Sequence, residues 1–205
     1  MGLDQAWDAS YKKNRLKWRG TTNFDPGLPQ GSRVLEAGCG NGKNLSSLLG
    51  KGLGLYGIDY SPEAVKQARG MVKSRGEKAA LSVQDLSSTN FKPGFFDAVV
   101  CFHVLGHMLE KEREKAVGEV KRMLKKGGLL FFREFSTKDF RFKKGIEYEK
   151  NSFLRRAILT HYFTDREVKD FFKSFKEKSF KKHKWNVHWD DKILEREEFD
   201  CVFEK

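Results

Sequence analysis

The chain has 205 residues, of which 39% are hydrophobic and 13% aromatic, so it is long enough for one domain with a buried core and short for two. Forty Lys and Arg against 28 Asp and Glu give a formal net charge of +12. The sequence has no stretch typical of a membrane span or signal peptide, and its three cysteines lack the spacing of a disulfide framework or metal site. We therefore expect a single-domain, cytoplasmic protein without a bound metal.

Residues 1–30 precede the regular pattern of the chain and carry an aromatic series. Trp7, Tyr11 and Trp18 fall within one helix-like stretch. Aromatic faces attract cations, so these rings are candidates for covering a cationic ligand, but they would equally well anchor a helix on a sheet. We expect a helical cap segment over a site that is built by residues 31–205.

Residues 33–44 hold the most specific motif. An apolar strand leads into Glu36 and then into Gly38, Gly40 and Gly42, with a helix-like run after them. Glycines at alternating positions allow a sharp turn and the close approach of a ligand, while the amides of the following helix face it. The dinucleotide pattern GxGxxG fails here, because its last glycine is replaced by Lys43.

Strand-like and helix-like segments alternate from residue 33 to about 135, which predicts a parallel sheet covered by helices on both faces. A helix start is expected at the N-cap Ser61, a charged helix over 111–126, and a last helix after the capping box that begins at Thr164. The expected strands are 33–37, 53–58, 79–83, 96–101 and 128–134, followed by 177–184 and 198–204. Residues 136–162 fall outside this pattern and are expected to cap the site.

The motif Glu-x-Gly-x-Gly-x-Gly resembles the first motif of the class I S-adenosylmethionine-dependent methyltransferases, and five parallel strands with a final hairpin are the layout of that family. The resemblance extends from about residue 31 to the end. It implies a doubly wound, mostly parallel seven-stranded α/β sheet with a C-terminal antiparallel strand. It also implies S-adenosylmethionine as the cofactor and S-adenosylhomocysteine as its product.

The same resemblance assigns roles to residues at the ends of the strands. The glycines would pass beneath the methionine half of the cofactor, Asp59 would accept both ribose hydroxyls, and Asp85 would bind the adenine amino group. Each of two residues also has a purely structural alternative to cofactor binding. Glu36 would be a buried carboxylate with all its hydrogen bonds made within the protein, and Asp59 would cap the helix that follows it. The residues expected at the cofactor are Tyr11, Trp18, Glu36, Gly38, Cys39, Gly40, Asn41, Gly42, Asp59, Tyr60, Asp85, Leu86, Phe102 and His103.

Methyl transfer is an in-line displacement in which positioning supplies much of the catalysis, and a base is needed only for a protonated acceptor. The candidates for that base are His103, His107 and Tyr162, each of which also has a structural interpretation. Arg133 and Glu134 follow the fifth strand and would either bind a charged substrate or pair with neighbours. The Asn/Asp-Pro-Pro-Tyr motif typical of exocyclic base amine methylation is absent from the sequence.

The acceptor is less constrained than the cofactor. Compact size and the leading aromatic helix favour a small molecule. An RNA or tRNA substrate is the alternative, because of the positive charge and the basic–aromatic runs at 140–144 and 181–185, with Trp189 nearby. The same runs would also be produced by edge strands that carry lysines to prevent pairing with other chains. A cofactor-binding partner subunit without catalysis is a third possibility.

Overall fold

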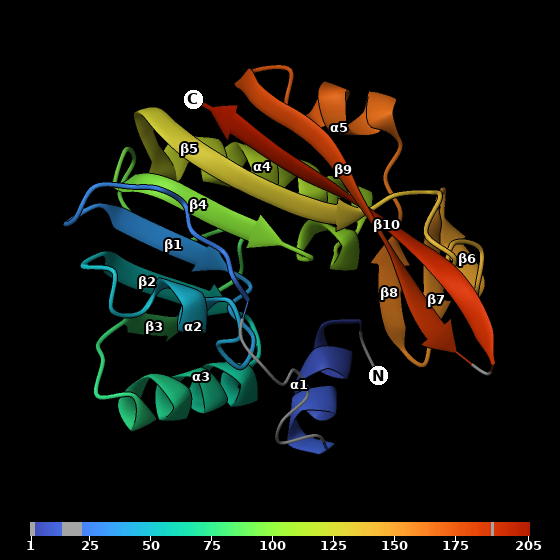
Figure 1. Cartoon of the computed structure of the whole chain (residues 1–205), viewed down its shortest axis with the longest axis horizontal. Coiled ribbons are helices and arrows are strands. Elements are labelled where there is room, and N and C mark those ends of the chain that lie inside the picture. Colours follow the sequence, from blue (N-terminus) through green and yellow to red (C-terminus); the bar gives the residue numbers. More distant parts are fainter. Residues whose placement is uncertain (1–2, 14–21, 190) are drawn as a thin grey trace.

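The computed structural model describes residues 3–13, 22–189 and 191–205. Seven strands form one sheet in the order β3-β2-β1-β4-β5-β10-β9 (Figure 1). Neighbours among β1 to β5 are parallel, whereas β10 is antiparallel to both β5 and β9. The predicted doubly wound sheet with a closing antiparallel strand is thereby confirmed. The strands of this sheet are β1 (Arg33–Ala37), β2 (Gly54–Asp59), β3 (Ala80–Val83), β4 (Phe96–Phe102), β5 (Leu124–Phe135), β9 (Lys176–Trp189) and β10 (Lys192–Glu204).

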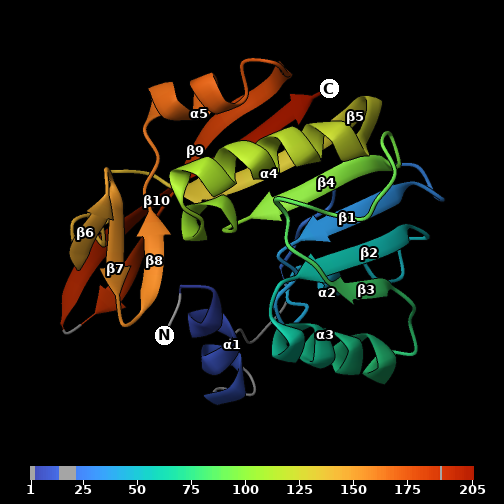
Figure 2. The same cartoon turned by 180° about the vertical axis from the view of Figure 1, so that it is seen from behind.

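Helices and packed side chains cover both faces of the sheet. Helices α4 and α5 lie on the face seen in Figure 2. On the opposite face, Phe24 packs edge-on against Phe102 and Phe131, and Leu48 joins the same cluster. The helical elements are α1 (Leu3–Lys13), α2 (Leu45–Leu48), α3 (Pro62–Ser74), the short 3-10 helix η1 (Leu105–His107), α4 (Glu110–Met123) and α5 (Asp165–Phe171).

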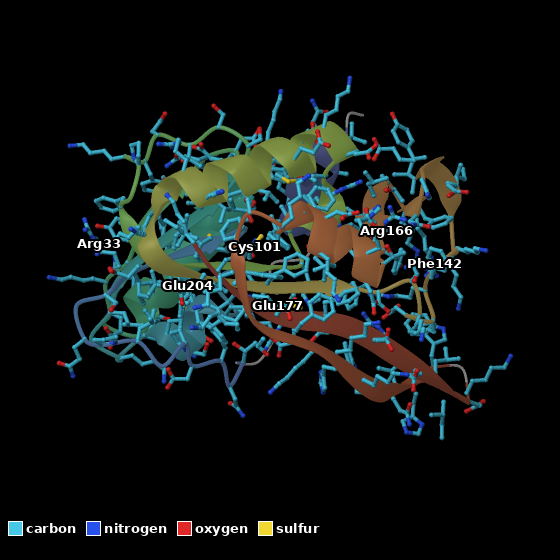
Figure 3. All side chains as sticks on the ribbon, turned by 90° about the horizontal axis from the view of Figure 1, so that it is seen from above. Arg33, Cys101, Phe142, Arg166, Glu177 and Glu204 are labelled. Carbon is cyan, nitrogen blue, oxygen red and sulfur yellow. The ribbon has the colours of Figure 1, made fainter. Side chains whose placement is uncertain are left out.

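The continuous apolar run of β4 explains its central place. Successive strand side chains point to opposite faces, so Val99 and Cys101 enter the cluster beneath α4, while Ala98 and Val100 enter the cluster on the other face. Cys101 lies in the interior in the view from above (Figure 3). A central strand of this kind aims its carboxyl end at the edge where ligands bind in such sheets.

The predicted start of α3 is confirmed in detail. The Ser61 hydroxyl accepts a hydrogen bond from Ala64 N at 3.1 Å, and Pro62 occupies the first turn. The same hydroxyl donates to Asp8 Oδ1 of α1 at 2.7 Å, and Glu63 N also donates to this oxygen, at 3.2 Å. The cap of α3 therefore also holds α1 in place.

Replacing Ser61 with Ala should lower the free energy of unfolding by about 1 kcal/mol, because Ala64 N and Asp8 both lose a partner. Urea unfolding would measure the loss. Ser174→Ala removes an exposed hydroxyl and should change stability by less than about 0.5 kcal/mol. Equal losses for the two variants would contradict the capping role.

The largest differences from the predicted bounds are in α4, β5, β9 and β10. The helix expected over 111–126 ends at Met123, because residues 124–126 already belong to β5. β9 and β10 are longer than expected and pair from Lys176 opposite Glu204 to Trp189 opposite Lys192. The end of this hairpin projects from the main body (Figure 3).

Residues 136–162 form a second sheet that the sequence did not predict. Its antiparallel strands are β6 (Ile146–Glu149), β7 (Ser152–Arg155) and β8 (Ile158–His161). The turns use Asn151, Arg156 and Ala157 at positive φ in place of glycine, so the usual turn signal is missing. In the part of the chain that the structure describes, no helix is long and apolar enough to cross a membrane.

Candidate active site

The loop between β1 and α2 turns through three glycines in the left-handed region. Gly38, Gly40 and Gly42 have φ values of 68°, 52° and 89°. Cys39 N donates to Ile58 O at 2.8 Å, which ties the loop to β2, and the Cys39 side chain is buried in the core. Asn41 is half-buried in the turn. The glycine turn is therefore present as predicted. Cys39 takes part in it through its backbone N–H, while its side chain packs in the core.

Helix α1 lies against this loop. Tyr11 is 5% exposed, and a Cβ added to Gly40 would come within 2.6 Å of the Tyr11 hydroxyl. Trp7 packs near Tyr11 at 6.1 Å between ring centroids and against His107 at 4.6 Å. Trp18, the other aromatic residue expected here, lies outside the described residues.

Gly40→Ala tests this contact, and Gly76→Ala is its matched control. Both positions have positive φ, so each variant should lose roughly 1–2 kcal/mol of stability from backbone strain. Only Gly40 has Tyr11 against it, since a Cβ at Gly76 would meet nothing within 4 Å. Gly40→Ala should therefore also weaken S-adenosylmethionine binding several-fold in calorimetric titration, and Gly76→Ala should not. Similar affinities for both variants would contradict the closeness of α1 to the ligand.

Asp59 ends β2 and connects two loops. Its Oδ2 accepts a hydrogen bond from Gly40 N at 2.9 Å, and its Oδ1 accepts one from Ser61 N at 2.9 Å. The side chain is 9% exposed, and burial raises its pKa even though both backbone N–H groups oppose the shift. Each carboxylate oxygen has further acceptor capacity, so Asp59 can receive ligand hydroxyls while it fixes the loop.

Glu36 is a fully buried acid beneath the same loop. Burial raises its pKa to about 8, although the Asn44 side chain and Leu45 N–H favour the ionised form. Its Oε2 has no hydrogen-bond partner. A buried, unpartnered carboxylate oxygen beside a glycine turn fits a ligand that carries a nucleoside and an amino group, which is the chemistry of S-adenosylmethionine.

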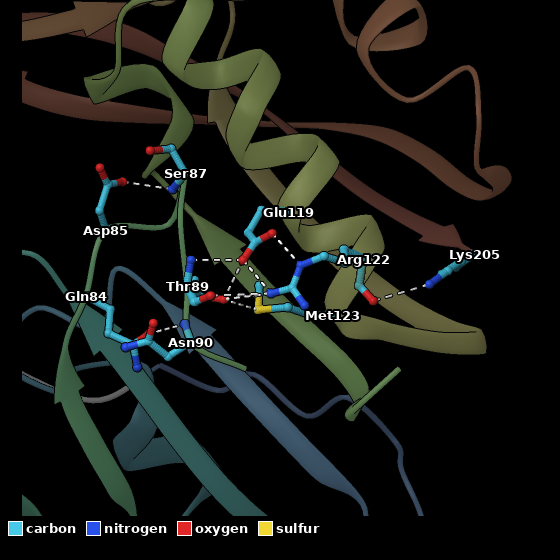
Figure 4. Close-up of polar contacts among 9 residues, drawn as sticks. All are labelled: Gln84, Asp85, Ser87, Thr89, Asn90, Glu119, Arg122, Met123 and Lys205. Carbon is cyan, nitrogen blue, oxygen red and sulfur yellow. Dashed lines mark hydrogen bonds and ion pairs between the residues drawn. The ribbon is translucent and has the colours of Figure 1, made fainter. Parts of the chain in front are cut away.

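Asp85 and Leu86 follow β3 on the adenine side of the expected site. Asp85 is exposed and accepts a hydrogen bond from Ser87 N at 2.8 Å, whereas Leu86 is buried. Tyr60 beyond β2 is 38% exposed. This loop is anchored to α4, because Glu119 accepts bonds from Thr89 and pairs with Arg122, which lowers the pKa of Glu119 to about 2 (Figure 4).

His103 follows β4 in a left-handed conformation with φ 56°. Its ring stacks on Phe135 at 4.3 Å between centroids, and its Nε2 lies 3.0 Å from Glu198 Oε2. Its Nδ1 is buried without a hydrogen-bond partner, 3.9 Å from Glu134 Oε2. Phe102 is 8% exposed and stacks with the Arg133 guanidinium at 4.4 Å.

The two carboxylates beside His103 have opposite pKa shifts. Burial raises the pKa of Glu134 to about 7, against the influence of His103 and of Gly106 N, which donates to Glu134 Oε1 at 2.8 Å. Burial also disfavours the ionised form of Glu198, but the hydrogen bond to His103 and the charges of His103, Arg133 and His183 together outweigh burial and lower the pKa of Glu198. Sequence reasoning missed Glu198, because only the pairing of β10 with β5 brings it to this edge.

The other two predicted acid–base residues have different surroundings. His107 Nδ1 lies 2.6 Å from Leu159 O. Tyr162 is 4% exposed and packs against Phe142 and Phe153, and burial raises its pKa. The structure does not bring Tyr162 into the contacts of His103. Its neighbour His161 is a structural residue, bonded to Ser152 Oγ at 2.8 Å and to Glu167 Oε1 at 2.6 Å.

Comparison with known proteins identifies the family of this site. A sequence profile for a methyltransferase domain matches residues 35–132, which include the glycine loop, Asp59, Asp85 and His103. A solved structure described as an S-adenosylmethionine-dependent methyltransferase, from Methanosarcina mazei, superposes with a TM-score of 0.76 at 27% identity, covering 87% of this chain and 94% of the other. The matched segment is a methyltransferase domain, and the superposition supports its assignment to the class I S-adenosylmethionine-dependent methyltransferases. The expected cofactor, S-adenosylmethionine, is thereby confirmed through the family.

The relatives of this methyltransferase domain differ in substrate. The tRNA N(3)-cytidine methyltransferase METTL2 of Danio rerio is 29% identical over 161 residues, which cover 73% of this chain and 46% of that protein. The ubiquinone biosynthesis O-methyltransferase of Thiobacillus denitrificans is 33% identical over 122 residues, covering 58% of this chain and 49% of that protein. The chain thus spans less than half the length of either relative.

Clusters of metal-ligating side chains and paired cysteines are both absent from the described residues. No group of three or more His, Cys, Asp or Glu side chains among residues 3–13, 22–189 and 191–205 is arranged to hold a metal ion. The three cysteines Cys39, Cys101 and Cys201 are free and buried.

Proposed function

We propose that the chain transfers a methyl group from S-adenosylmethionine, by in-line displacement, to a small-molecule acceptor and releases S-adenosylhomocysteine. The observation that carries this proposal is the joined arrangement of the glycine loop, Asp59 and the buried Glu36 at the carboxyl edge of the sheet. The sulfonium of the cofactor supplies the electrophilic methyl group.

In this proposal each group of residues contacts a different part of S-adenosylmethionine. Gly38, Gly40 and Gly42 pass under the methionine half, Asp59 receives the ribose hydroxyls, and Asp85 with Leu86 N–H receives the adenine. The π faces of Tyr11 and Trp18 cover the sulfonium, which would contribute about 0.5–2 kcal/mol. Residues 1–30 then form a cap over the domain of residues 31–205. The burial of Tyr11 against Gly40 supports that division.

A small acceptor is supported by the pairing of the basic hairpin. Lys182 pairs with Asp165, and Lys184 pairs with Glu195 at 2.9 Å and Glu197 at 3.3 Å. These lysines are therefore partly neutralised, which weakens the case for a polyanion on this face. We also propose a cytosolic location, which the three free, buried cysteines support.

RNA is the second candidate acceptor. The net charge of +12, the 53% exposure of Trp189 and the stacking of His183 on Trp185 at 5.1 Å favour it, since aromatic faces beside basic residues bind single strands. The tRNA-modifying relative supports the same candidate.

Calorimetric titration with S-adenosylmethionine and S-adenosylhomocysteine, with and without bulk tRNA, tests both candidates. Micromolar binding that tRNA leaves unchanged is expected for a small-molecule enzyme. Binding that tightens with tRNA, with an affinity that falls steeply with salt, would favour RNA. Binding without product from any acceptor would indicate a partner subunit, and no cofactor binding would overturn the proposal.

A further inference from the structure

Three titratable side chains form a row from the candidate site to solvent. His103 Nε2 lies 3.0 Å from Glu198 Oε2, and the second oxygen of Glu198, Oε1, lies 3.7 Å from His183 Nδ1. Glu198 is 8% exposed, whereas the His183 side chain is 62% exposed. The row therefore joins the end of β4 to the surface of β9 through one buried carboxylate on β10.

The row determines the tautomer of His103. An ionised carboxylate can only accept, so the contact with Glu198 requires the proton of a neutral imidazole to be on Nε2. Nδ1 then carries a lone pair. Because Nδ1 is buried and lacks a hydrogen-bond partner, its lone pair is unused in the structure.

The backbone and the neighbouring ring hold His103 in this orientation. Its positive φ is uncommon for a residue other than glycine, and such conformations concentrate at functional sites. His103 N donates to Arg133 O at 2.8 Å, and the ring stacks on Phe135. The conformation is thus fixed by β5, which also supplies Glu134 beside Nδ1.

We propose that His103 is the catalytic base for an acceptor hydroxyl, and that Glu198 and His183 conduct the proton to solvent. This inference rests on the proposed function. The acceptor oxygen bonds the methyl carbon as the carbon–sulfur bond breaks and its electron pair stays on sulfur. The hydroxyl proton passes to His103 Nδ1, the Nε2 proton passes to Glu198, and Glu198 passes a proton to His183 and water.

The surrounding charges favour this transfer. A proton that arrives at His103 is flanked by Glu134 of β5 and Glu198 of β10, which stabilise an imidazolium. The ionised form of Glu198 is favoured against burial first by His103 and then by Arg133, whereas burial keeps the pKa of Glu134 raised. The step of 3.7 Å to His183 is within reach of a bridging water or a small side-chain movement.

The proposal narrows the class of acceptor. A ring nitrogen with a free lone pair attacks a methyl group without losing a proton, so it has no use for a base. A hydroxyl must lose its proton, and a buried imidazole nitrogen between two carboxylates is suited to taking it. Of the acceptors that need a base, the proposal commits to hydroxyl-bearing small molecules, so that the reaction is an O-methylation.

Nitrogen NMR of histidine-labelled full-length protein, bound to S-adenosylhomocysteine, tests the row. In the wild type, Nε2 of His103 should be protonated and Nδ1 not, and Glu198→Gln should disturb this preference. Phenol should shift the Nδ1 signal, and anisole, which has no hydroxyl proton, should not. A protonated Nδ1 in the wild type, or no response to saturating phenol, would overturn the assignment of the base.

Solvent exchange of the Nε2 proton separates conduction from a structural role. His183→Gln should slow this exchange roughly tenfold, equivalent to about 1.4 kcal/mol on the barrier, without changing the tautomer. His188→Gln is the matched control, since His188 is an exposed histidine of the same strand and lies outside the row. Equal exchange in both variants would overturn the exit path. Calorimetry of the same samples separates this failure from failure of the proposed function, which would abolish cofactor binding itself.

Discussion

Replacing Asp59 with Ala is expected to weaken S-adenosylhomocysteine binding roughly thirtyfold, which corresponds to about 2 kcal/mol. The carboxylate is the sole hydrogen-bond acceptor described for Gly40 N and for Ser61 N, and in the proposed site it also receives the ribose hydroxyls. The variant therefore loses both the fixed shape of the glycine loop and a charged acceptor for the ligand. Calorimetric titration measures the change.

A ligand-side control separates those two losses. The 2′,3′-dideoxy analogue of S-adenosylhomocysteine lacks the hydroxyls that Asp59 is proposed to bind. It should bind wild-type protein more weakly than the parent compound, yet the two should bind Asp59→Ala with nearly equal affinity, because no hydroxyl partner remains. If the variant still prefers the parent compound as strongly as the wild type does, Asp59 does not bind the ribose.

Glu36→Gln is expected to make the free energy of unfolding less dependent on pH, because it removes the one proton that Glu36 binds more tightly in the folded chain. The pKa of Glu36 is about 8 in the folded chain and 4.5 as its ordinary value, so between these pH values the folded chain holds a proton that the unfolded chain has lost. Stability of the wild type therefore falls as pH rises through this window, by about 1.4 kcal/mol per pH unit for one proton. Urea unfolding at pH 5.5, 7.0 and 8.5 would show a shallower slope for the variant.

Two other glutamates are needed to interpret the Glu36→Gln result, one as a second contributor to the pH dependence and one as a control. Glu134, with a pKa of about 7, contributes in the same direction, so a slope should persist in Glu36→Gln up to neutral pH. Glu119 has a pKa of about 2 and stabilises the fold above pH 4.5, with a loss only as pH falls toward 2. Glu119→Gln should therefore leave the slope between pH 5.5 and 8.5 unchanged. A Glu36→Gln slope that matches the wild type would show that Glu36 ionises normally in the folded chain.

The parallel half of the fold could be predicted because its signals are local. Strands buried on both faces read as apolar runs, as in residues 98–101, and Ser61 with Pro62 marks a helix start through its own chemistry. The glycine loop and Asp59 could be predicted for the same reason, since each stands at the end of a strand whose partners follow in chain order.

The remaining parts depend on contacts that are distant in sequence. Glu198 meets His103 because β10 inserts beside β5 with Glu198 opposite Phe135, a register that no local pattern encodes. The small sheet turns through Arg156 and Ala157 without glycine, so its hairpins have no turn signature. The extension of the β9–β10 hairpin is polar on both strands, and its lysines and glutamates pair with each other. It therefore lacks the alternating apolar pattern by which a strand is predicted from sequence.

The sheet order also has a consequence for biogenesis. β10 alone joins β5 to β9, so the hydrogen-bonding edge of β5 has no partner until the segment 192–204 has docked. An uncovered strand with Leu130, Phe131 and Phe132 is a template for pairing with other chains. Nascent or heated protein should therefore aggregate through β5, and slow docking of a strand so distant in sequence lengthens that vulnerable interval. A chaperone that shields this edge should therefore raise the yield of folded protein.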